Sequence, residues 1–155
     1  MRHDHIIQGY RYLLRPVGDS DVNFILELRT NPKLNRFLHP TPNDAQRQLS
    51  WLSEYYQRDN DYYFVVERSV NHRSEGLISV YNIDWNKRCG EWGRWVLVPN
   101  SLAAVESVLL LFRFAFEIIN LDCVYTRTII ENHRVVSFHD SCGIPDRRII
   151  KDCFQ

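Results

Sequence analysis

The segment Val98–Ser101 has residue types that could prepare a phosphate site. Pro99 cannot donate to a strand ladder, so we expect a strand to end there. Asn100 or Ser101 can then cap a helix whose first turn, Leu102–Val105, offers unpaired backbone N–H groups and partial positive charge. A pyrophosphate would fit such a turn. An ordinary capped helix without a ligand is the simpler alternative.

A second group of candidate residues lies between Asn132 and Gly143. Asn132 follows a stretch rich in β-branched residues and can cap a helix. Within that helix, one stripe at helical spacing consists of Val135, Phe138, His139 and Cys142. His139 therefore lies on or beside the inward face. It is either a group that moves a proton near neutral pH or a packed side chain with both ring nitrogens satisfied.

The composition limits the class of protein. With 155 residues and 45% apolar side chains, we expect one domain with a substantial core. Nineteen basic and nineteen acidic side chains cancel, which gives no sign of a nucleic-acid-binding face. No apolar run approaches the roughly 20 residues that cross a bilayer. None of the four cysteines forms a CxxC pair, so we expect no metal site and a reduced, cytoplasmic protein.

The elements that must position these residues follow from the hydrophobic periodicity. We expect residues 1–8 to be loose. Predicted strands are Tyr10–Val17, Tyr62–Arg68, Glu75–Ile83, Trp92–Val98 and Cys123–Ile130. Predicted helices begin after Asp19 or Ser20, span Asn43–Gln57 and Leu102–Asn120, and begin again after Asn132. The helix 102–120 is apolar nearly all round, which predicts a buried helix.

The order of these elements predicts a mixed α/β sheet. Short polar turns between Tyr62 and Val98 indicate an antiparallel meander. A strand, an apolar helix and a strand in succession then imply a right-handed crossover. The fourth and fifth strands would form a parallel pair. Residues 1–155 are therefore expected to form one α/β domain.

From Glu91 onward, the chain resembles the GNAT acetyltransferases. In that family an Asn follows the fifth strand, and the next helix runs to a Gly followed by an aromatic or aliphatic residue. Asn132 and Gly143-Ile144 match this pattern. The family's pyrophosphate loop usually carries glycines, whereas this chain has Asn100-Ser101-Leu102-Ala103-Ala104-Val105. The small alanines replace the glycines, and the main-chain amides survive that change.

The resemblance implies acetyl-CoA as co-substrate and suggests which residues hold it. The pyrophosphate would lie on the loop, at Asn100, Ser101, Ala103, Ala104 and Val105. The pantetheine arm would pair with the backbone of Trp95, Val96, Leu97 and Val98 like an added strand. Asn132 would bind the same arm. Arg134 would pair with a phosphate of the coenzyme, unless it is a solvated arginine on the helix surface.

The resemblance also suggests the catalytic groups. His139 stands four residues before Gly143, where many GNAT members place a tyrosine that protonates the departing thiolate. A histidine can do the same because its pKa lies near working pH. Glu91 is the candidate base, since some members carry a carboxylate at the start of this strand. Asp84, Glu131 and a chain of water molecules are alternatives.

The implied reaction is acetyl transfer from acetyl-CoA to the primary amine of a small molecule. The Glu91–Trp95 sequence and the aromatic residues near the second helix suit a stacked sugar or nucleotide ring: Trp51, Tyr55, Tyr56, Tyr62 and Tyr63. An amino-sugar nucleotide is therefore the favoured acceptor. A protein or peptide N-terminal acetyltransferase and a non-catalytic acyl-CoA-binding module are the alternatives.

The C-terminal end departs from the family pattern. The GNAT domain usually continues with two more strands after the Gly, whereas only Arg147–Phe154 is left here to supply one. We expect a sixth strand at most, and a domain that is truncated or completed by a neighbouring chain. An open sheet edge of this kind invites a homodimer.

Overall fold

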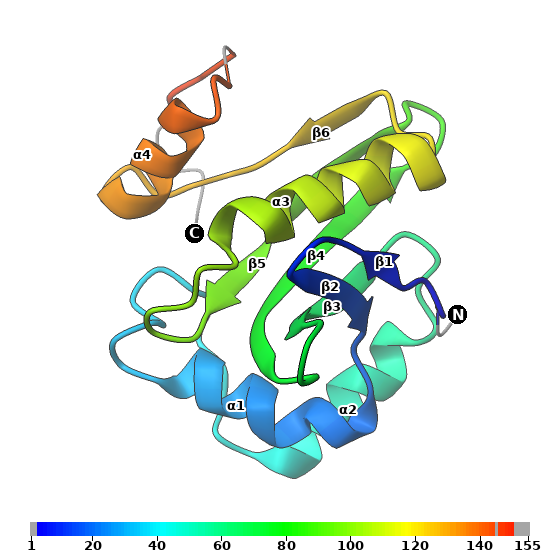
Figure 1. The fold of residues 1–155 in the computed structure, drawn as a ribbon, viewed down its shortest axis with the longest axis vertical. Helices are drawn as coiled ribbons and strands as arrows, with labels where there is room; N and C mark the ends of the chain where they lie inside the picture. The colour runs from blue at the N-terminus through cyan, green and yellow to red at the C-terminus, as the bar shows by residue number, and fades with distance from the viewer. Residues whose placement is uncertain (1–2, 145, 151–155) are drawn as a thin grey trace.

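A computed structural model describes residues 3–144 and 146–150. Its six strands form one sheet in the order β1-β2-β3-β4-β5-β6 (Figure 1). The strands are β1 Ile7–Gln8, β2 Tyr12–Pro16, β3 Tyr62–Arg68, β4 Ser74–Asp84, β5 Cys89–Leu97 and β6 Cys123–Tyr125. Each neighbouring pair is antiparallel except β5 and β6, which run parallel. The predicted mixed α/β sheet, with its meander and one parallel pair, is confirmed.

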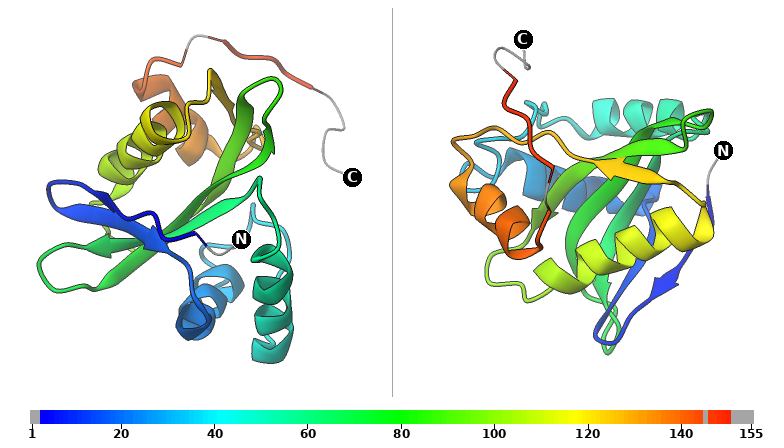
Figure 2. Two further views of the ribbon diagram at one scale, coloured as in Figure 1. Left: turned by 90° about the vertical axis from the view of Figure 1, so that its right-hand side faces the viewer. Right: turned by 90° about the horizontal axis from the view of Figure 1, so that it is seen from above.

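The helices cover both faces of the sheet. They are α1 Val22–Thr30, α2 Ala45–Tyr55, α3 Ala104–Arg113 and α4 His133–Ser141, with a 3-10 turn at Asp19–Asp21 and a π-helical turn at Phe114–Ile118. Figure 2 shows α1 and α2 on one side of the sheet and α3 and α4 on the other. This is a layered domain with two half-cores.

Strand alternation supplies both half-cores, because successive side chains point to opposite faces. Phe64 and Ile78 pack with Leu111 and Phe114 on the α3 side. Their neighbours Val65 and Leu77 pack on the α1 and α2 side, with Ile25 and Leu52. The strands are therefore buried on both faces over their middle residues.

Two helix starts show how local sequence decides a boundary. Asp44 caps α2, since its carboxylate accepts hydrogen bonds from the backbone N–H groups of Gln46 (2.9 Å) and Arg47 (3.1 Å). The expected cap of α3 by Asn100 or Ser101 is wrong. The N-cap is Ala103, which has no capping side chain, because the helix begins two residues later than expected. The Ser101 hydroxyl accepts from the Ala103 N–H at 3.2 Å and donates to Glu75 at 2.8 Å.

Other expectations need correction. Residues 7–8 are not loose but pair with Leu13 and Leu14 as β1. The strand expected over 123–130 ends at Tyr125. The α3 segment is not buried all round, since Leu102, Val105 and Leu109 are exposed. Residues 146–150 form no strand, and the rest of the predicted sixth strand lies outside the described residues.

The helices of the described ranges are too short or too polar to cross a bilayer. The longest of them, α2, has only 11 residues. A spanning helix needs roughly 20 apolar residues.

Candidate active site

The sheet splits where β5 leaves β6. The parallel pairing covers three residue pairs, Cys89 with Cys123, Gly90 with Val124 and Glu91 with Tyr125. Beyond Glu91, β5 continues to Leu97 and pairs only with β4 among the described strands. Figure 1 shows the two strands side by side at one end and diverging toward the start of α3. The split leaves main-chain groups of Trp92–Leu97 available to a bound molecule.

A β-bulge lies within this free stretch of β5. Ser79 pairs with Gly93 and Leu77 with Val96, so two residues of β5 oppose the single residue Ile78. One of the two, Arg94, has a positive φ of 49°. The extra residue shifts the alternation of side chains, because a bulge re-aims the residues after it. Arg94 thereby points to the α1 and α2 side, while Trp95 packs on the α3 side.

The split opens into a cavity of about 560 Å³, here called the central cavity. Its walls come from three places: the α1–α2 connection, strands β4 and β5, and the chain from β6 into α4. Lining residues include Phe37 and Leu38, then Tyr81, Glu91, Trp92 and Trp95, then Arg127, Asn132, Val135 and His139. The cavity therefore brings together both predicted catalytic residues, which are 48 positions apart in the sequence.

Glu91 lies on the wall of this cavity and is only 3% exposed. Its carboxylate accepts two hydrogen bonds from Arg127, at 2.9 Å from Nε and 2.7 Å from Nη2. Two more come from the Tyr81 hydroxyl (3.1 Å) and the Asn82 amide (3.2 Å). Burial, and then Glu91, raise the pKa of Tyr81 to about 12, which keeps this hydroxyl a donor. Four donors fill the usual acceptor sites of a carboxylate.

His139 lies on the α4 side of the central cavity and is 7% exposed. Its ring packs against Trp92 with 5.4 Å between ring centroids. Its Nε2 is buried and has no hydrogen-bond partner among the described residues. Burial, followed by the charge of Arg147, lowers the pKa of His139, while Asp140 acts in the opposite direction. The imidazole is therefore a buried group with one ring nitrogen that has no partner among the described residues.

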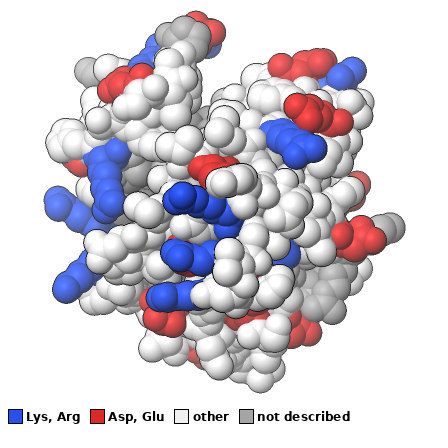
Figure 3. Space-filling view, in the orientation of Figure 1, with Lys and Arg blue, Asp and Glu red and all other residues white. Residues whose placement is uncertain are grey.

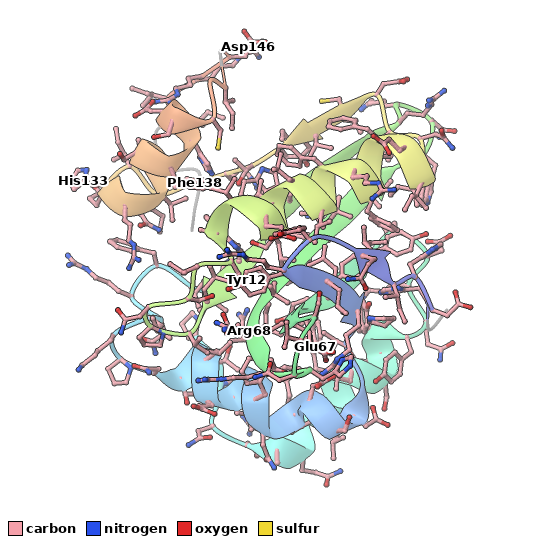
Figure 4. All side chains as sticks on the ribbon, viewed as in Figure 1. Tyr12, Glu67, Arg68, His133, Phe138 and Asp146 are labelled. Atoms are coloured by element: carbon pink, nitrogen blue, oxygen red, sulfur yellow. The ribbon has the colours of Figure 1, made fainter. Side chains whose placement is uncertain are left out.

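The rest of α4 is arranged largely as its sequence indicates. Val135 is half-buried, and Phe138 packs against Trp95 at 4.8 Å. In Figure 4, Phe138 lies on the side of α4 nearer α3, whereas His133 lies at its outer edge. Cys142, expected in the same stripe, is exposed because α4 ends at Ser141. Gly143 follows with a φ of 67°, a conformation suited to glycine just past a helix end.

The predicted cofactor residues lie along one path beside the split. Trp95 donates through its indole to Ser107 on α3 at 3.3 Å, Val96 is buried, and Leu97 and Val98 are half-buried. Asn100 adopts a positive φ of 64°. Ala103 is buried and Ala104 half-buried at the start of α3, whereas Val105 is exposed. The open helix start leaves the first N–H groups of α3 without side-chain caps.

Asn132 and Arg134 differ in position. Asn132 lines the central cavity and stands at the N-cap of α4, but its side chain makes no capping hydrogen bond. Its amide therefore does not serve as the simple helix cap expected from the sequence. Arg134 is exposed on the outer surface of the first turn.

Several residues of the site could not be foreseen. Arg127 follows β6 and pairs with Glu91 across 36 sequence positions. Asp61 forms a two-pronged ion pair with Arg94, at 2.6 Å and 3.0 Å. Burial acts to lower the pKa of Arg94, but the Asp61 carboxylate outweighs it and raises that pKa. The sequence signals for both pairs are single arginines, one within β5 and one just after β6, which are too common to be diagnostic.

The chain belongs to the GNAT acetyltransferases. A family model described as an acetyltransferase (GNAT) domain matches residues 11–144. A comparison with curated proteins found no match.

Two solved structures illustrate the similarity. The apo form of FdhC, a nucleotide-linked sugar GNAT, has a TM-score of 0.83 and 28% sequence identity, over 97% of this chain and 86% of that one. Spermidine N-acetyltransferase SpeG from Vibrio cholerae, in complex with CoA and spermine, has a TM-score of 0.81 and 21% identity, over 93% and 87% of the two chains. The similarity to SpeG shows a shared fold.

Proposed function

Since the chain has a GNAT domain, we propose that it transfers acetyl from acetyl-CoA to the primary amine of a small molecule. The observation that carries this proposal is the central cavity at the split between β5 and β6. This cavity is lined by the free edge of β5, by the buried imidazole of His139 and by several arginines. In this reaction a C–N bond forms, the C–S bond of the thioester breaks, and one proton moves from nitrogen to sulfur.

The cofactor side would use mainly the backbone. The free edge of β5, at Trp95–Leu97 and on to Val98, is suited to pair with the amides of the pantetheine arm. The loop Asn100–Val105 and the first N–H groups of α3 are suited to the pyrophosphate. Asn132 would reach the same arm from the opposite wall. Arg134, at the surface, would meet a phosphate of the coenzyme.

His139 would carry the proton to the leaving sulfur. Its buried Nε2 has no partner in the described structure, so a ligand atom or a water in the central cavity can use it. The lowered pKa keeps the ring neutral at rest near pH 7. A neutral imidazole can take up the proton that the amine loses, and a protonated imidazole with a low pKa gives it up readily.

Glu91 would either take the amine proton or hold the wall in place. Direct transfer requires the carboxylate to release one of its four donors. A water in the cavity that passes the amine proton on to His139 needs no such rearrangement and is the route we favour. Glu91 would then act by fixing Arg127 and Tyr81 at the cavity wall.

The acceptor would be an amino-sugar nucleotide. Charged side chains that line the central cavity are Arg29, Arg36, Arg94, Arg127 and Glu91. This excess of positive charge suits a phosphorylated acceptor and opposes a polyamine. Ring stacking on Tyr55 and Tyr63 is not supported, because Tyr55 on α2 and Tyr63 on β3 are both buried. Trp51 is also engaged, since its ring stacks on Tyr55 at 5.6 Å.

The experiment is a titration with CoA, followed by acetyl-CoA turnover over a panel of amines. The panel contains amino-sugar nucleotides, N-terminal peptides and spermidine, and free thiol and acetylated product are both measured. We expect CoA binding and turnover with the nucleotides. Turnover only with peptides would select the peptide N-acetyltransferase, and binding without any turnover would select a non-catalytic acyl-CoA-binding module. Absence of CoA binding would contradict all three.

A homodimer through the open edge beside β6 is a separate prediction. The described part of β6 has three residues, and its outer edge has no partner strand among the described residues. Size-exclusion chromatography with light scattering measures the mass in solution. A monomeric mass at high protein concentration would contradict the dimer without affecting the proposed reaction.

A further inference from the structure

A second cavity of about 400 Å³ lies between α1, α2 and the sheet, and is here called the α1–α2 cavity. Arg29, His39 and Arg94 line both this cavity and the central one. The two spaces therefore meet at these side chains. A molecule whose amine lies in the central cavity can extend into the α1–α2 cavity.

Positive charge at this junction is compensated at some arginines and not at Arg29. Arg94 is paired with Asp61, and Arg127 with Glu91. The Arg29 guanidinium instead donates to neutral oxygens, the Thr41 hydroxyl at 2.8 Å and the His39 carbonyl at 3.4 Å. No carboxylate of the described residues forms an ion pair with it. Its full charge is thus held in place by two neutral contacts.

A buried hydroxyl lies on the wall of the same cavity. Tyr63 is 1% exposed, and its hydroxyl makes no hydrogen bond of good geometry with the described residues, although the Arg29 side chain lies close to it. An unsatisfied buried polar group is costly, so such a group commonly has a ligand or a water as partner. Burial raises the pKa of Tyr63, whereas the charges of Arg29 and Arg94 and a close side-chain contact with Arg29 act in the opposite direction. The phenol is therefore a proton donor at neutral pH.

The rest of the cavity is consistent with an anionic occupant. Gln48, which is buried on α2, and the exposed Arg47 also line it. Figure 3 shows Lys and Arg side chains along the left edge of that view, beside the α1–α2 connection and below α4. The α1–α2 connection, residues 31–44, carries Lys33 and Arg36. An approaching anion thus meets positive charge before it reaches Arg29.

We propose that the α1–α2 cavity binds the diphosphate of the acceptor, with Arg29 and the Tyr63 hydroxyl as donors. This inference rests on the proposed function and adds to it the orientation of the bound acceptor. The diphosphate lies between α1 and α2, and the amine lies across the junction in the central cavity. Arg29 is then a specificity-determining residue that distinguishes phosphorylated amines from neutral and cationic ones.

The test is a calorimetric titration of the whole chain with uridine diphosphate in the presence of saturating CoA. The CoA prevents the probe from binding at the coenzyme's own phosphate sites. We expect the wild type to bind uridine diphosphate more tightly than uridine, and to show no binding of spermidine. Arg29→Gln should weaken binding of the diphosphate by about 10-fold to 100-fold, and Tyr63→Phe by about 10-fold. Higher salt should weaken the wild type more than Arg29→Gln.

Three control variants separate charge recognition from folding. Arg73→Gln removes an exposed arginine on the β3–β4 turn and should leave the affinity unchanged. Thr41→Val breaks the Arg29–Thr41 hydrogen bond but keeps the charge, and should cost less than Arg29→Gln. Arg29→Lys should retain part of the affinity. CoA affinity and the melting temperature report the fold of each variant.

The outcomes distinguish this inference from the proposed function. No binding of uridine diphosphate to the wild type, or equal affinity in Arg29→Gln, would overturn the diphosphate site even if an amine is acetylated. An equal loss in Thr41→Val and Arg29→Gln would assign Arg29 to loop anchoring and would also overturn it. Conversely, failure of acetyl transfer leaves the binding result standing, because the titration needs no turnover.

Discussion

The two sides of the site are built from different parts of the chain. The proposed cofactor side consists of the free edge of β5, the loop before α3 and the start of α4, so main-chain groups dominate it. The proposed acceptor side consists of side chains that hold one another through ion pairs, such as Arg94 with Asp61 and Arg127 with Glu91. Backbone groups are common to all residues, whereas a charged pair depends on both partners.

In the proposed function, this difference would let a loop without glycines bind the pyrophosphate. Ala103 and Ala104 stand at the start of α3, and the N–H groups of that first turn are still present. A substitution on the cofactor side therefore changes little unless it moves the backbone. A substitution on the acceptor side leaves a buried partner unsatisfied. Single substitutions should consequently cost more on the acceptor side than on the cofactor side.

The largest effect is expected for Asp61→Asn, on the acceptor side. The change leaves the mostly buried guanidinium of Arg94 without its carboxylate, because Asp61 accepts from both of its terminal nitrogens. We expect a loss of about 3 kcal/mol in the free energy of unfolding, measured by urea denaturation. Asp122→Asn, which removes an exposed pair with Arg88, should cost less than about 1 kcal/mol. Equal losses in the two variants would contradict the account.

His139→Phe should affect turnover more than binding. Removal of the proton carrier should lower kcat by about 100-fold, since general acid–base catalysis is worth that much or more. The affinity for CoA should change less than about 2-fold, because it depends on backbone groups. Steady-state kinetics and calorimetry measure the two quantities. His133→Phe, on the exposed surface of the same helix, is the matched control. Unchanged kcat in His139→Phe would remove this residue from the mechanism.

Ser101→Ala should have a smaller effect on the cofactor side. It removes the hydrogen bond from the Ser101 hydroxyl to Glu75 and should cost about 1 kcal/mol of stability. Arg68 still pairs with Glu75, so the carboxylate keeps a partner. CoA affinity should fall by less than about 3-fold, because the amides of the loop remain. A larger loss would show that the hydroxyl itself contacts the coenzyme. Ser53→Ala, in an exposed position on α2, is the control.

The smallest expected effect near neutral pH is a change in stability with pH, which comes from the half-buried His3 and the buried His139. Burial lowers the pKa of His3 to about 4, and it also lowers that of His139. The unfolded chain therefore binds more protons than the folded one below about pH 6.5. Stability should be complete above that pH and should fall as the pH drops toward 4. His3→Phe should reduce this pH dependence, as measured by urea midpoints at several pH values. A pH dependence equal to that of the wild type would contradict the assignment.

Much of the fold could be predicted because it depends on local patterns. The strand Tyr62–Arg68 has the predicted bounds, and α4 begins directly after Asn132 with His139 on its inward side. The cap of α3 was wrong because the helix begins after Ala103, while Ser101 bonds the Ala103 N–H before it and Glu75, 26 positions away. β1 was missed because two residues carry no periodicity.

The acceptor side could not be predicted for a related reason. Arg94 would face the α3 side in a regular strand, and only the bulge turns it toward Asp61. The pairing of Glu91 with Arg127 depends on how β5 and β6 are brought together. Neither a bulge nor a contact between distant residues leaves a clear periodic signal in a single sequence.

The most direct test of the central claim is a turnover assay with acetyl-CoA and an amino-sugar nucleotide. Thiol release and the mass of the product are followed together in the wild type and in His139→Phe. The account predicts one thiol released for each acetylated amine in the wild type, and a rate lower by about 100-fold in the variant. No acetylated product for any amine, with the protein folded and CoA bound, would contradict it.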